Sequence, residues 1–400
     1  MGEPPAVERP LVLVANARMP SARAQSVQLC RAAQAFQDLG ADTTVVHAAR
    51  RDTPRLPAEE VWARLATAPA ARPRRGWPAL EAAPCIDWID ALPRPLQFAP
   101  ARLQEWSFGR SAARIVRERH GAARVLVRDL EAAVALRGRP GVAIELHRVP
   151  GGRLRRRWLR ECVDAGQPIV AISGGVRGDL EALGVPAERI TVEHDAHDPA
   201  LGAALPDRAE ARASLGLPEV GDVVLYAGGL LRWKGVDVLV DAARSGALGG
   251  ATVVIVGGME ADVRALRARA AGVDTVRVVG HRPAHEVPRF LAAADVGVVP
   301  NRRSPRISSH HTSPLKVFEA MAAGLPLVVS DLPSLRDVLA GDEAVFVEPE
   351  SPAALAAGVR GLLDGPEERA GLAARAAEAV RAHTWGARAR RILTFMEEHA

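Results

Sequence analysis

The chain has 400 residues, 48% of them hydrophobic and 25% charged, with a formal net charge of +5. That length allows two or three domains, and the apolar share supplies enough area for substantial cores, which argues against wholesale disorder. The small positive balance does not by itself indicate nucleic-acid binding, and no apolar run approaches the roughly 18 residues that a membrane span needs.

Short β-branched runs alternate with longer Ala-, Leu- and Arg-rich segments of helical period in both halves of the chain. This alternation is typical of βαβ units, so the sequence predicts two doubly wound parallel sheets with ligands at the carboxyl ends of their strands. Six strands are expected in the first half, at 11–16, 43–48, 124–129, 142–147, 169–174 and 190–195. Six more are expected in the second half, at 223–229, 251–258, 275–280, 296–301, 326–330 and 344–348.

Three segments fall outside this alternation. Residues 50–100 hold nine prolines and three tryptophans without a clear period, and we interpret them as an elaborated crossover or lid. Residues 198–216 contain two prolines and no strand pattern, so the predicted domains are 1–198 and 199–383. Residues 384–400 are expected to form a helix. The three cysteines, Cys30, Cys85 and Cys162, are odd in number and widely spaced, which favours a reducing cytoplasm.

The run SSHHTSPLKVFEAMAAGLP predicts a helix that starts just beyond a strand end. Ser313 is a favourable N-cap, Pro314 a favourable first helical residue, and Leu315 begins the apolar face. Free N–H groups and the dipole at a helix start bind phosphate, and Thr312 and Ser313 can add hydroxyl donors. Glu319 lies about 7 Å further along the axis, where its carboxylate can accept bonds from ribose hydroxyls. The alternative is a capped core helix whose glutamate bonds to neighbouring backbone.

A second motif, YAGGLLRWKGVDVLVDA, places a glycine pair and two cations after a strand. Gly228 and Gly229 allow the backbone to approach a ligand closely. Arg232 and Lys234 would neutralise a diphosphate, both when it binds and when it becomes a leaving group. The alternative is a surface turn with two solvated cations.

Taken together, these motifs resemble the donor domain of the family 4 retaining glycosyltransferases, which have the GT-B fold of two Rossmann-like domains facing a cleft. Lys234-Gly235 resembles that family's Lys-Gly, and SPLKVFEAMAAGLPLVVSD resembles its phosphate-and-ribose helix. His281 and Arg282 fall in a segment similar to the one that holds the base. The terminal HTWGARARRIL is similar to the helix that crosses back to the first domain. The resemblance covers residues 220–393.

Two positions depart from the family's pattern. The family often carries two glutamates eight residues apart; Glu319 matches the second, but His311 stands at the first, which in the family contacts the transferred sugar. The family also commonly has a basic residue just after the first donor-domain glycines, where this chain has Gly229. Whether Arg232 replaces it stays open.

The first half resembles the family more loosely. Asn16 and Gln25 match the loop and helix that follow the first acceptor-domain strand, and would face the cleft. His147 matches a family histidine near the transferred sugar, with a purely structural strand-end histidine as the alternative. Ser173 is expected at a strand end on the acceptor side.

Two charged groups carry weaker hypotheses. His194, Asp195, His197 and Asp198 are potential metal ligands, but the resemblance implies a strand-to-hinge turn and no metal requirement. The five arginines of RLRRRWLR, residues 153–160, form either a solvated face or a contact for an anionic membrane surface or acceptor.

The resemblance implies transfer of a hexose-type sugar from a nucleoside diphosphate donor, a UDP- or GDP-sugar, to an unknown hydroxyl acceptor with retention of configuration. The expected catalytic set is His147, Arg232, Lys234 and His311, with no metal or further cofactor. The protein is expected in the cytoplasm, with peripheral membrane contact left open and no nucleic-acid partner. The alternatives are a degenerate GT-B partner subunit that binds nucleotide or membrane, and a sugar-nucleotide epimerase or phosphorylase.

Overall fold

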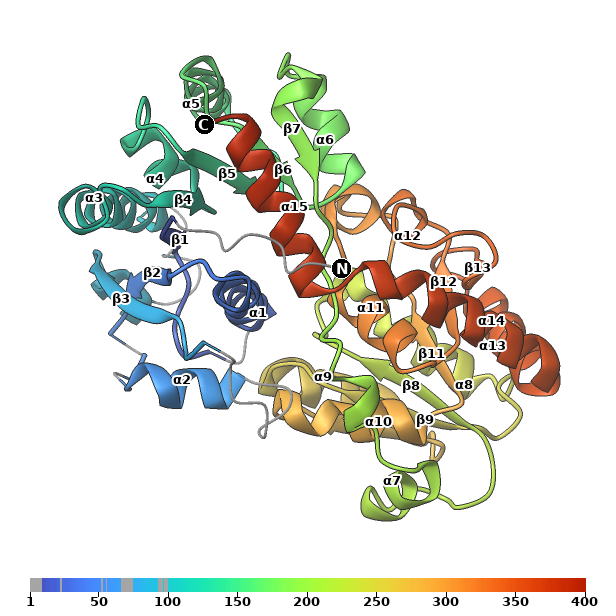
Figure 1. The fold of residues 1–400 in the computed structure, drawn as a ribbon. Coiled ribbons are helices and arrows are strands. Elements are labelled where there is room, and N and C mark those ends of the chain that lie inside the picture. Colours follow the sequence, from blue (N-terminus) through green and yellow to red (C-terminus); the bar gives the residue numbers. More distant parts are fainter. Residues whose placement is uncertain are drawn as a thin grey trace. The chain divides into compact units, whose positions relative to one another are not determined.

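The computed structural model of the chain describes residues 9–21, 24–51, 53–54, 56–65, 75–92, 96 and 100–400. These residues form two compact units (Figure 1). The first consists of Met1–Ile172, Val176–Glu193 and Trp385–Ala400, and the second of Ser173–Gly175 and His194–Thr384. The chain therefore leaves the first unit and returns to it at the C-terminal helix.

A seven-stranded parallel sheet is the centre of the first unit, with the order β3-β2-β1-β4-β5-β6-β7. Buried aliphatic side chains from the strands and flanking helices form its core. The strands are β1 (Leu11–Ala15), β2 (Thr43–Ala49), β3 (Ala79–Pro84), β4 (Arg124–Val127), β5 (Val142–Leu146), β6 (Ile169–Ala171) and β7 (Ile190–Val192). The helices are α1 (Ala24–Asp38), α2 (Ala58–Leu65), α3 (Ala101–Arg119), α4 (Leu130–Ala135), α5 (Arg153–Asp164), α6 (Gly174–Glu181) and α15 (Trp385–Glu398).

A six-stranded parallel sheet is the centre of the second unit, with the order β10-β9-β8-β11-β12-β13. Apolar side chains pack on both of its faces. The strands are β8 (Val223–Ala227), β9 (Thr252–Val256), β10 (Val276–Gly280), β11 (Val296–Val299), β12 (Leu327–Ser330) and β13 (Val345–Val347). The helices are α7 (Arg208–Ser214), α8 (Val236–Arg244), α9 (Glu260–Ala270), α10 (Val287–Ala293), α11 (Leu315–Ala322), α12 (Pro333–Arg336), α13 (Pro352–Asp364) and α14 (Pro366–Ala379).

The predicted α/β class is confirmed, and all twelve predicted strands are present; eleven are shorter than predicted, and β2 is one residue longer. The interpretation of residues 50–100 as a crossover or lid was wrong in one respect, because β3 lies within them and pairs with β2 along six residues. The β3 sequence, ALEAAP, has no β-branched residue, so it carries no strand pattern of its own. Residues 66–74, 93–95 and 97–99 of that region, and residues 1–8, lie outside the described residues.

The direction in which strands are added reverses once in each sheet, between β1 and β4 and between β8 and β11. In open α/β sheets, ligands bind beyond the carboxyl ends of the strands at such a switch point. The segments that leave β8 and β11 are the two motifs singled out in the sequence, so the fold brings them to one edge of the second sheet.

The C-terminal helix α15 packs against α1 of the first unit. Arg388 on α15 is 2% exposed, and its Nη2 lies 3.3 Å from Oε1 of Glu145 on β5. Arg128, just after β4, places its Nη2 3.0 Å from the same oxygen. Burial alone would raise the pKa of Glu145. The charges of these two arginines nevertheless hold that pKa well below its usual range. A buried ion cluster thus joins α15 to the sheet.

Candidate functional site

The loop after β8 contains a short 3-10 turn, Arg232–Lys234, that ends at Gly235. Gly235 has a φ of +66°, and a Cβ added there would lie 1.8 Å from the carbonyl oxygen of Pro300. Only glycine fits this close approach to the segment that leaves β11. The carbonyl of Trp233 accepts the Arg302 N–H at 2.9 Å, which fixes the loop a second time. These contacts bind the cationic loop to the neighbouring strand end.

Lys234 lies over the ring of Trp233, with its Nζ 4.1 Å from the ring centre. Burial lowers the pKa of Lys234 to about 8, and the negative charge of Asp195 opposes that shift. Arg232 is exposed. The pair therefore presents one exposed cation and one partly desolvated amine.

The start of α11 differs from its sequence-based prediction. The helix begins at Leu315, which is half-buried, and its N-cap is Pro314 with an extended backbone, so Ser313 is not the N-cap. The physical reason is that the Ser313 Oγ accepts the N–H of Asp195 at 2.8 Å instead of capping the helix. Because that bond uses only a lone pair, the Ser313 hydroxyl hydrogen stays available to a ligand.

The lysine within α11 was missed as a site residue. The Nζ of Lys316 is buried without a hydrogen-bond partner and lies 4.1 Å from the ring centre of Tyr226. Burial, and then the charge of Lys234, lower the pKa of Lys316 well below its usual range. A lysine on the first turn of a mostly apolar helix was the available signal, since unpaired buried charges are costly and therefore rare.

Glu319 is half-buried on the next turn of α11. Its neighbour Phe318 is fully buried and contacts the ring of His383, with 5.4 Å between ring centres. The packed phenylalanine holds the helix against the core, which fixes where the glutamate lies.

The residues before α11 form a five-residue π-helix, Ile307–His311. His311 is 8% exposed at its end, and the half-buried Thr312 follows in extended conformation. The Ser334 hydroxyl donates to the Ser308 carbonyl at 2.7 Å and so ties this turn to α12. π-Helical turns are rare and frequent at functional sites.

His281 and Arg282 follow β10 and are both exposed. Strand β10 is two positions from β8, so its end lies about 10 Å from the Gly228-Gly229 turn. The Arg282 Nε lies 3.6 Å from the Glu286 carboxylate. These residues therefore lie at the same sheet edge as the lysines, but not beside them.

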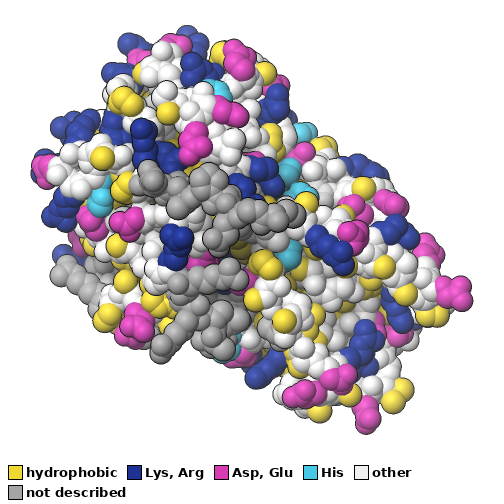
Figure 2. Space-filling view, in the orientation of Figure 1, with side chains coloured by type: hydrophobic (Ala, Val, Ile, Leu, Met, Phe, Trp, Pro, Cys, Tyr) yellow, Lys and Arg dark blue, Asp and Glu magenta, His cyan; other side chains and the backbone are white. Residues whose placement is uncertain are grey.

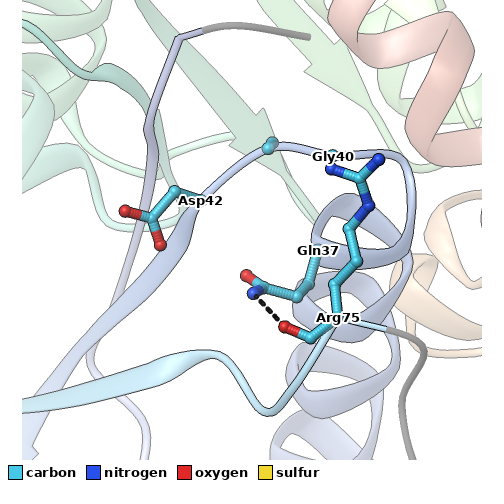
Figure 3. A pocket seen from close by; sticks show the side chains of 5 residues that line it. Gln37, Gly40, Asp42 and Arg75 are labelled. Carbon is cyan, nitrogen blue, oxygen red and sulfur yellow. Dashed lines mark hydrogen bonds between the residues drawn. The ribbon is translucent and has the colours of Figure 1, made fainter. Parts of the chain in front are cut away.

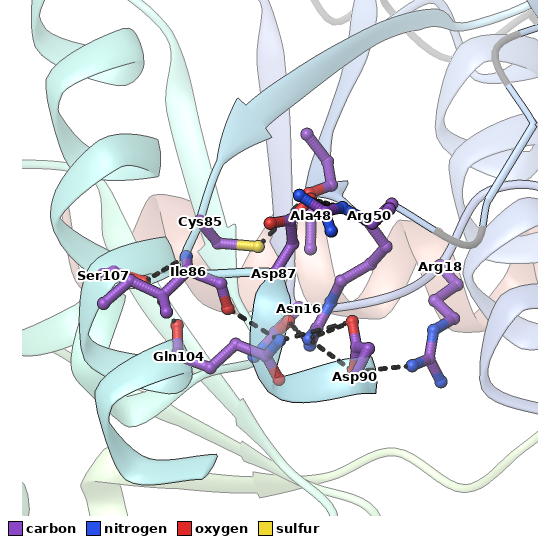
Figure 4. Close-up of polar contacts among 12 residues, drawn as sticks. Asn16, Arg18, Ala48, Arg50, Cys85, Ile86, Asp87, Asp90, Gln104 and Ser107 are labelled. Carbon is purple, nitrogen blue, oxygen red and sulfur yellow. Dashed lines mark hydrogen bonds and ion pairs between the residues drawn. The ribbon is translucent and has the colours of Figure 1, made fainter. Parts of the chain in front are cut away.

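In the first unit, polar side chains gather at the carboxyl ends of the strands (Figure 4). The Asn16 N–H, just after β1, donates to Asp129 Oδ2 at 2.5 Å, across the switch point. The Asn16 side-chain oxygen accepts from Arg50, and both Arg50 and Arg18 pair with Asp90. Asn16 is therefore held in place by the residues that follow β2 and β4.

His147, just after β5, joins the buried ion cluster. Its Nε2 lies 2.7 Å from Glu145 Oε1, and Arg128 contacts the same nitrogen. Burial and the charge of Arg128 lower the pKa of His147 to about 4, against the opposing effect of Glu145. The imidazole is therefore neutral at pH 7. Gln25, near the start of α1, is exposed.

Ser173 belongs to the second unit, not to the first where the acceptor-side prediction put it. Its hydroxyl donates to the His310 carbonyl at 3.1 Å. Beside it, the four potential metal ligands of the 194–198 segment have separate partners: His194 approaches Asp337 at 3.6 Å, and His197 approaches the Val380 carbonyl at 3.1 Å. Within the described part of the chain, no group of three such ligands converges.

A shallow surface pocket in the first unit is lined by Gln37, Gly40, Ala41, Asp42 and Arg75 (Figure 3). It lies at the amino end of β2, the edge of the sheet opposite to Asn16. Elsewhere, Figure 2 shows basic and acidic side chains interspersed on the face in view. Among the residues that the structure describes, no helix is both long and apolar enough to cross a membrane.

Residues 207–379 match the sequence model of the family "Glycosyl transferases group 1". D-inositol 3-phosphate glycosyltransferase 1 of Catenulispora acidiphila is 33% identical over 201 residues, 47% of this chain and 46% of that protein. The corresponding enzyme of Kineococcus radiotolerans is 30% identical over 257 residues, 58% of this chain and 57% of that protein. The chain thus spans about half the length of the curated relatives it matches.

Solved structures extend the likeness to the whole fold. HepE of Anabaena, in complex with UDP, aligns over 97% of this chain and all of its own, with a TM-score of 0.70 and 18% identity. Sucrose-phosphate synthase of Thermosynechococcus elongatus aligns over 98% of this chain and 99% of its own, with a TM-score of 0.73 and 18% identity. The predicted resemblance is therefore confirmed: residues 207–379 of the second unit match glycosyl transferases group 1, and the chain has the two-domain α/β fold of GT-B glycosyltransferases.

Proposed function

We propose that the protein is a glycosyltransferase that moves a hexose-type sugar from a nucleoside diphosphate donor to an acceptor hydroxyl with retention of configuration. The observation that carries the proposal is the meeting of Lys234 and the start of α11 at the switch point of a group 1 domain. Two amines and a helix start at one sheet edge suit a diphosphate.

The donor assignment follows the order of groups along this edge. Thr312, Ser313 and the N–H groups of the first α11 turn, from Pro314-Leu315 onward, face the phosphates, and Glu319 accepts from the ribose. The turn at Gly228 and Gly229 lets the donor approach the backbone. His281 and Arg282 are placed at the base. Solved relatives are described in complex with UDP and with UDP-glucose, which favours a uridine donor over a guanosine one.

Catalysis is assigned to groups that stabilise the leaving diphosphate. Arg232 and Lys234 balance its developing charge, and the leaving phosphate helps to take the acceptor proton on the same face of the sugar. His147, neutral at pH 7, and His311 are placed at the transferred sugar as hydrogen-bonding groups. No step needs a metal ion in this scheme.

The first unit is proposed to bind the acceptor, with Asn16 and Gln25 nearest to it and Ser173 on the side of the second unit. The curated relatives are named for inositol 3-phosphate. We place the protein in the cytoplasm. We also place a peripheral membrane contact at α5, because Arg153, Leu154 and Arg156 are exposed together on this helix.

His311 supports a second candidate, a GT-B subunit that binds nucleotide without transferring sugar. In that case no carboxylate reaches the sugar from the first motif position, because His311 stands there. The protein would then bind the donor without transferring its sugar. A sugar-nucleotide epimerase is the third candidate, and it would consume donor without any acceptor.

The test begins with thermal unfolding of the full chain in a panel of UDP- and GDP-sugars, because a ligand of the native state raises its stability by mass action. The stabilising donor is then incubated with candidate acceptors and the products are analysed for anomeric configuration. Binding without turnover supports the degenerate subunit. Donor binding by Lys234→Ala and Glu319→Ala variants at wild-type affinity would contradict the proposed site.

A further inference from the structure

The two lysines of this chain meet at one place. Of its 52 lysines and arginines, only Lys234 and Lys316 are lysines. They lie 82 positions apart in the sequence, yet the charge of Lys234 acts directly on Lys316. Where a cation is needed only for charge, arginine serves throughout this protein. We infer that this site needs amines in particular, which unlike guanidinium can lose their proton.

Lys316 is held beside the glycine turn at the end of β8. Its Cδ is 3.5 Å from the position that a Gly228 Cβ would take, and the Tyr226 hydroxyl is 3.3 Å from the same position. That hydroxyl donates to the Gly229 carbonyl at 2.6 Å, so the tyrosine ring under the amine is fixed. The Lys316 stem therefore runs along the turn, with no side chain of Gly228 to block it.

The amine itself has no hydrogen-bond partner among the residues that the structure describes. The described groups that act on it are the Tyr226 ring on β8 and the Lys234 ammonium in the 3-10 turn, while the nearby carboxylate of Asp195 acts on Lys234. A cation–π contact replaces only part of the lost hydration of an ammonium group. When both amines carry a proton, two like charges share one carboxylate, and a doubly charged anion would balance them.

We propose that Lys316 is a second anion-binding amine of the donor site, which takes up a proton from solvent when a diphosphate binds against it and Lys234. The inference rests on the proposed function for the identity of the ligand. In the empty site, burial and the charge of Lys234 disfavour the charged form of the Lys316 amine, because both lower its pKa well below the usual range. On binding, rotation around the four side-chain bonds of Lys316 turns its Nζ toward the phosphate. The amine then gains a proton and donates charge-assisted hydrogen bonds to the phosphate.

Having only two lysines makes the proposal directly measurable. In full-length protein carrying lysine labelled with ¹³C at Cε, each lysine gives one resonance, assigned with Lys234→Arg and Lys316→Arg. Pyrophosphate, UDP and GDP are then added across a pH series. We expect both resonances to move and both lysines to titrate at higher pH in the complex. A Lys316 resonance that stays still while Lys234 moves would overturn the proposal.

Calorimetry provides the second readout. Binding in two buffers of different ionisation enthalpy gives the number of protons taken up. We expect Lys316→Met to bind pyrophosphate and UDP about 10- to 100-fold more weakly and to take up fewer protons. Because this change removes an unpaired buried amine, the empty variant should melt no earlier than wild type. The control is Arg264→Met, an exposed cation on α9, which should leave both quantities unchanged.

The outcomes separate this inference from the proposed function. If sugar transfer is observed but Lys316→Met retains wild-type affinity and proton uptake, only the role of Lys316 is wrong. If pyrophosphate moves both resonances but no nucleotide-sugar is bound or turned over, the anion site stands and the glycosyltransferase proposal fails. If no diphosphate moves either resonance, both are wrong.

Discussion

The backbone N–H of Asp195 donates to the Oγ of Ser313 at 2.8 Å, and the Asp195 carboxylate acts on Lys234. One residue of the segment after β7 therefore acts on both halves of the proposed phosphate site. The Ser313 hydroxyl is oriented by the hydrogen bond that it accepts from Asp195. The Asp195 carboxylate favours the charged form of the Lys234 amine. This arrangement couples donor binding to pH.

Donor binding should weaken above pH 8. Burial lowers the pKa of Lys234 to about 8, so below that pH the amine is charged and can meet a diphosphate without gaining a proton. Above it, binding must include proton uptake, and affinity should fall by up to about tenfold per pH unit. Calorimetric titration with UDP between pH 6 and 10 measures this, and Lys234→Arg should flatten the profile near pH 8.

Replacing Asp195 with asparagine should move that profile to lower pH. The carboxylate raises the pKa of Lys234 against the larger effect of burial, and its removal leaves burial unopposed. The Asp195 N–H to Ser313 bond is retained, because it involves only backbone of residue 195. An unchanged midpoint in Asp195→Asn would show that the carboxylate does not act on the amine.

Gly235→Ala should abolish donor binding and destabilise the second unit. The new Cβ would meet the Pro300 carbonyl at 1.8 Å, and the residue would also have to keep a φ of +66°. We expect a loss of about 2–4 kcal/mol of unfolding free energy, measured by denaturant titration. Gly246→Ala is the matched control: its φ is +75°, but nothing lies within 4 Å of the added Cβ. It should lose only about 1 kcal/mol.

The sequence predicted most of this architecture because parallel strands buried on both faces are apolar runs. LVLVA at β1 and TVVIV at β9 are such runs, and both were recognised. The edge strand β3 could not be, since ALEAAP is only partly buried and has no β-branched residue. Most strands were predicted too long, because the sequence does not show where sheet pairing stops and residues such as Asn16, just after β1, turn to other partners.

The candidate site was predictable only where local motifs carry it. Lys234-Gly235 is a local pattern, and the close contact with Pro300 explains its glycine. The meeting of Lys316 with Tyr226 and Lys234 depends on strand order, because β8 and β11 become neighbours only when the sheet reverses. The hydroxyl of Ser313 was assigned to its own helix because sequence spacing does not show a partner 118 residues away.

Glu145 should contribute to the pH dependence of stability in the first unit at acid pH. Arg128 and Arg388 hold the pKa of this buried carboxyl well below its usual range, so its stabilising effect is complete above the unfolded-state pKa of about 4.3. That effect is lost as pH falls through the lower folded-state pKa. Glu145→Gln should flatten the acid limb of unfolding free energy, whereas the exposed Glu378→Gln should leave it unchanged.

Removing Arg388 should loosen the C-terminal helix from the first sheet. The side chain is 2% exposed, so Arg388→Met deletes one of two cations facing Glu145 and leaves Arg128 as the other. Because one partner remains, we expect a loss of about 1–3 kcal/mol, less than for a fully orphaned buried charge.

Hydrogen exchange of the α15 amides measures this loss without assuming that both units unfold together. The control, Arg381→Met, removes an exposed pair with Glu378 and should change stability by less than about 1 kcal/mol. Equal protection of α15 in both variants would show that the buried cluster does not hold the helix.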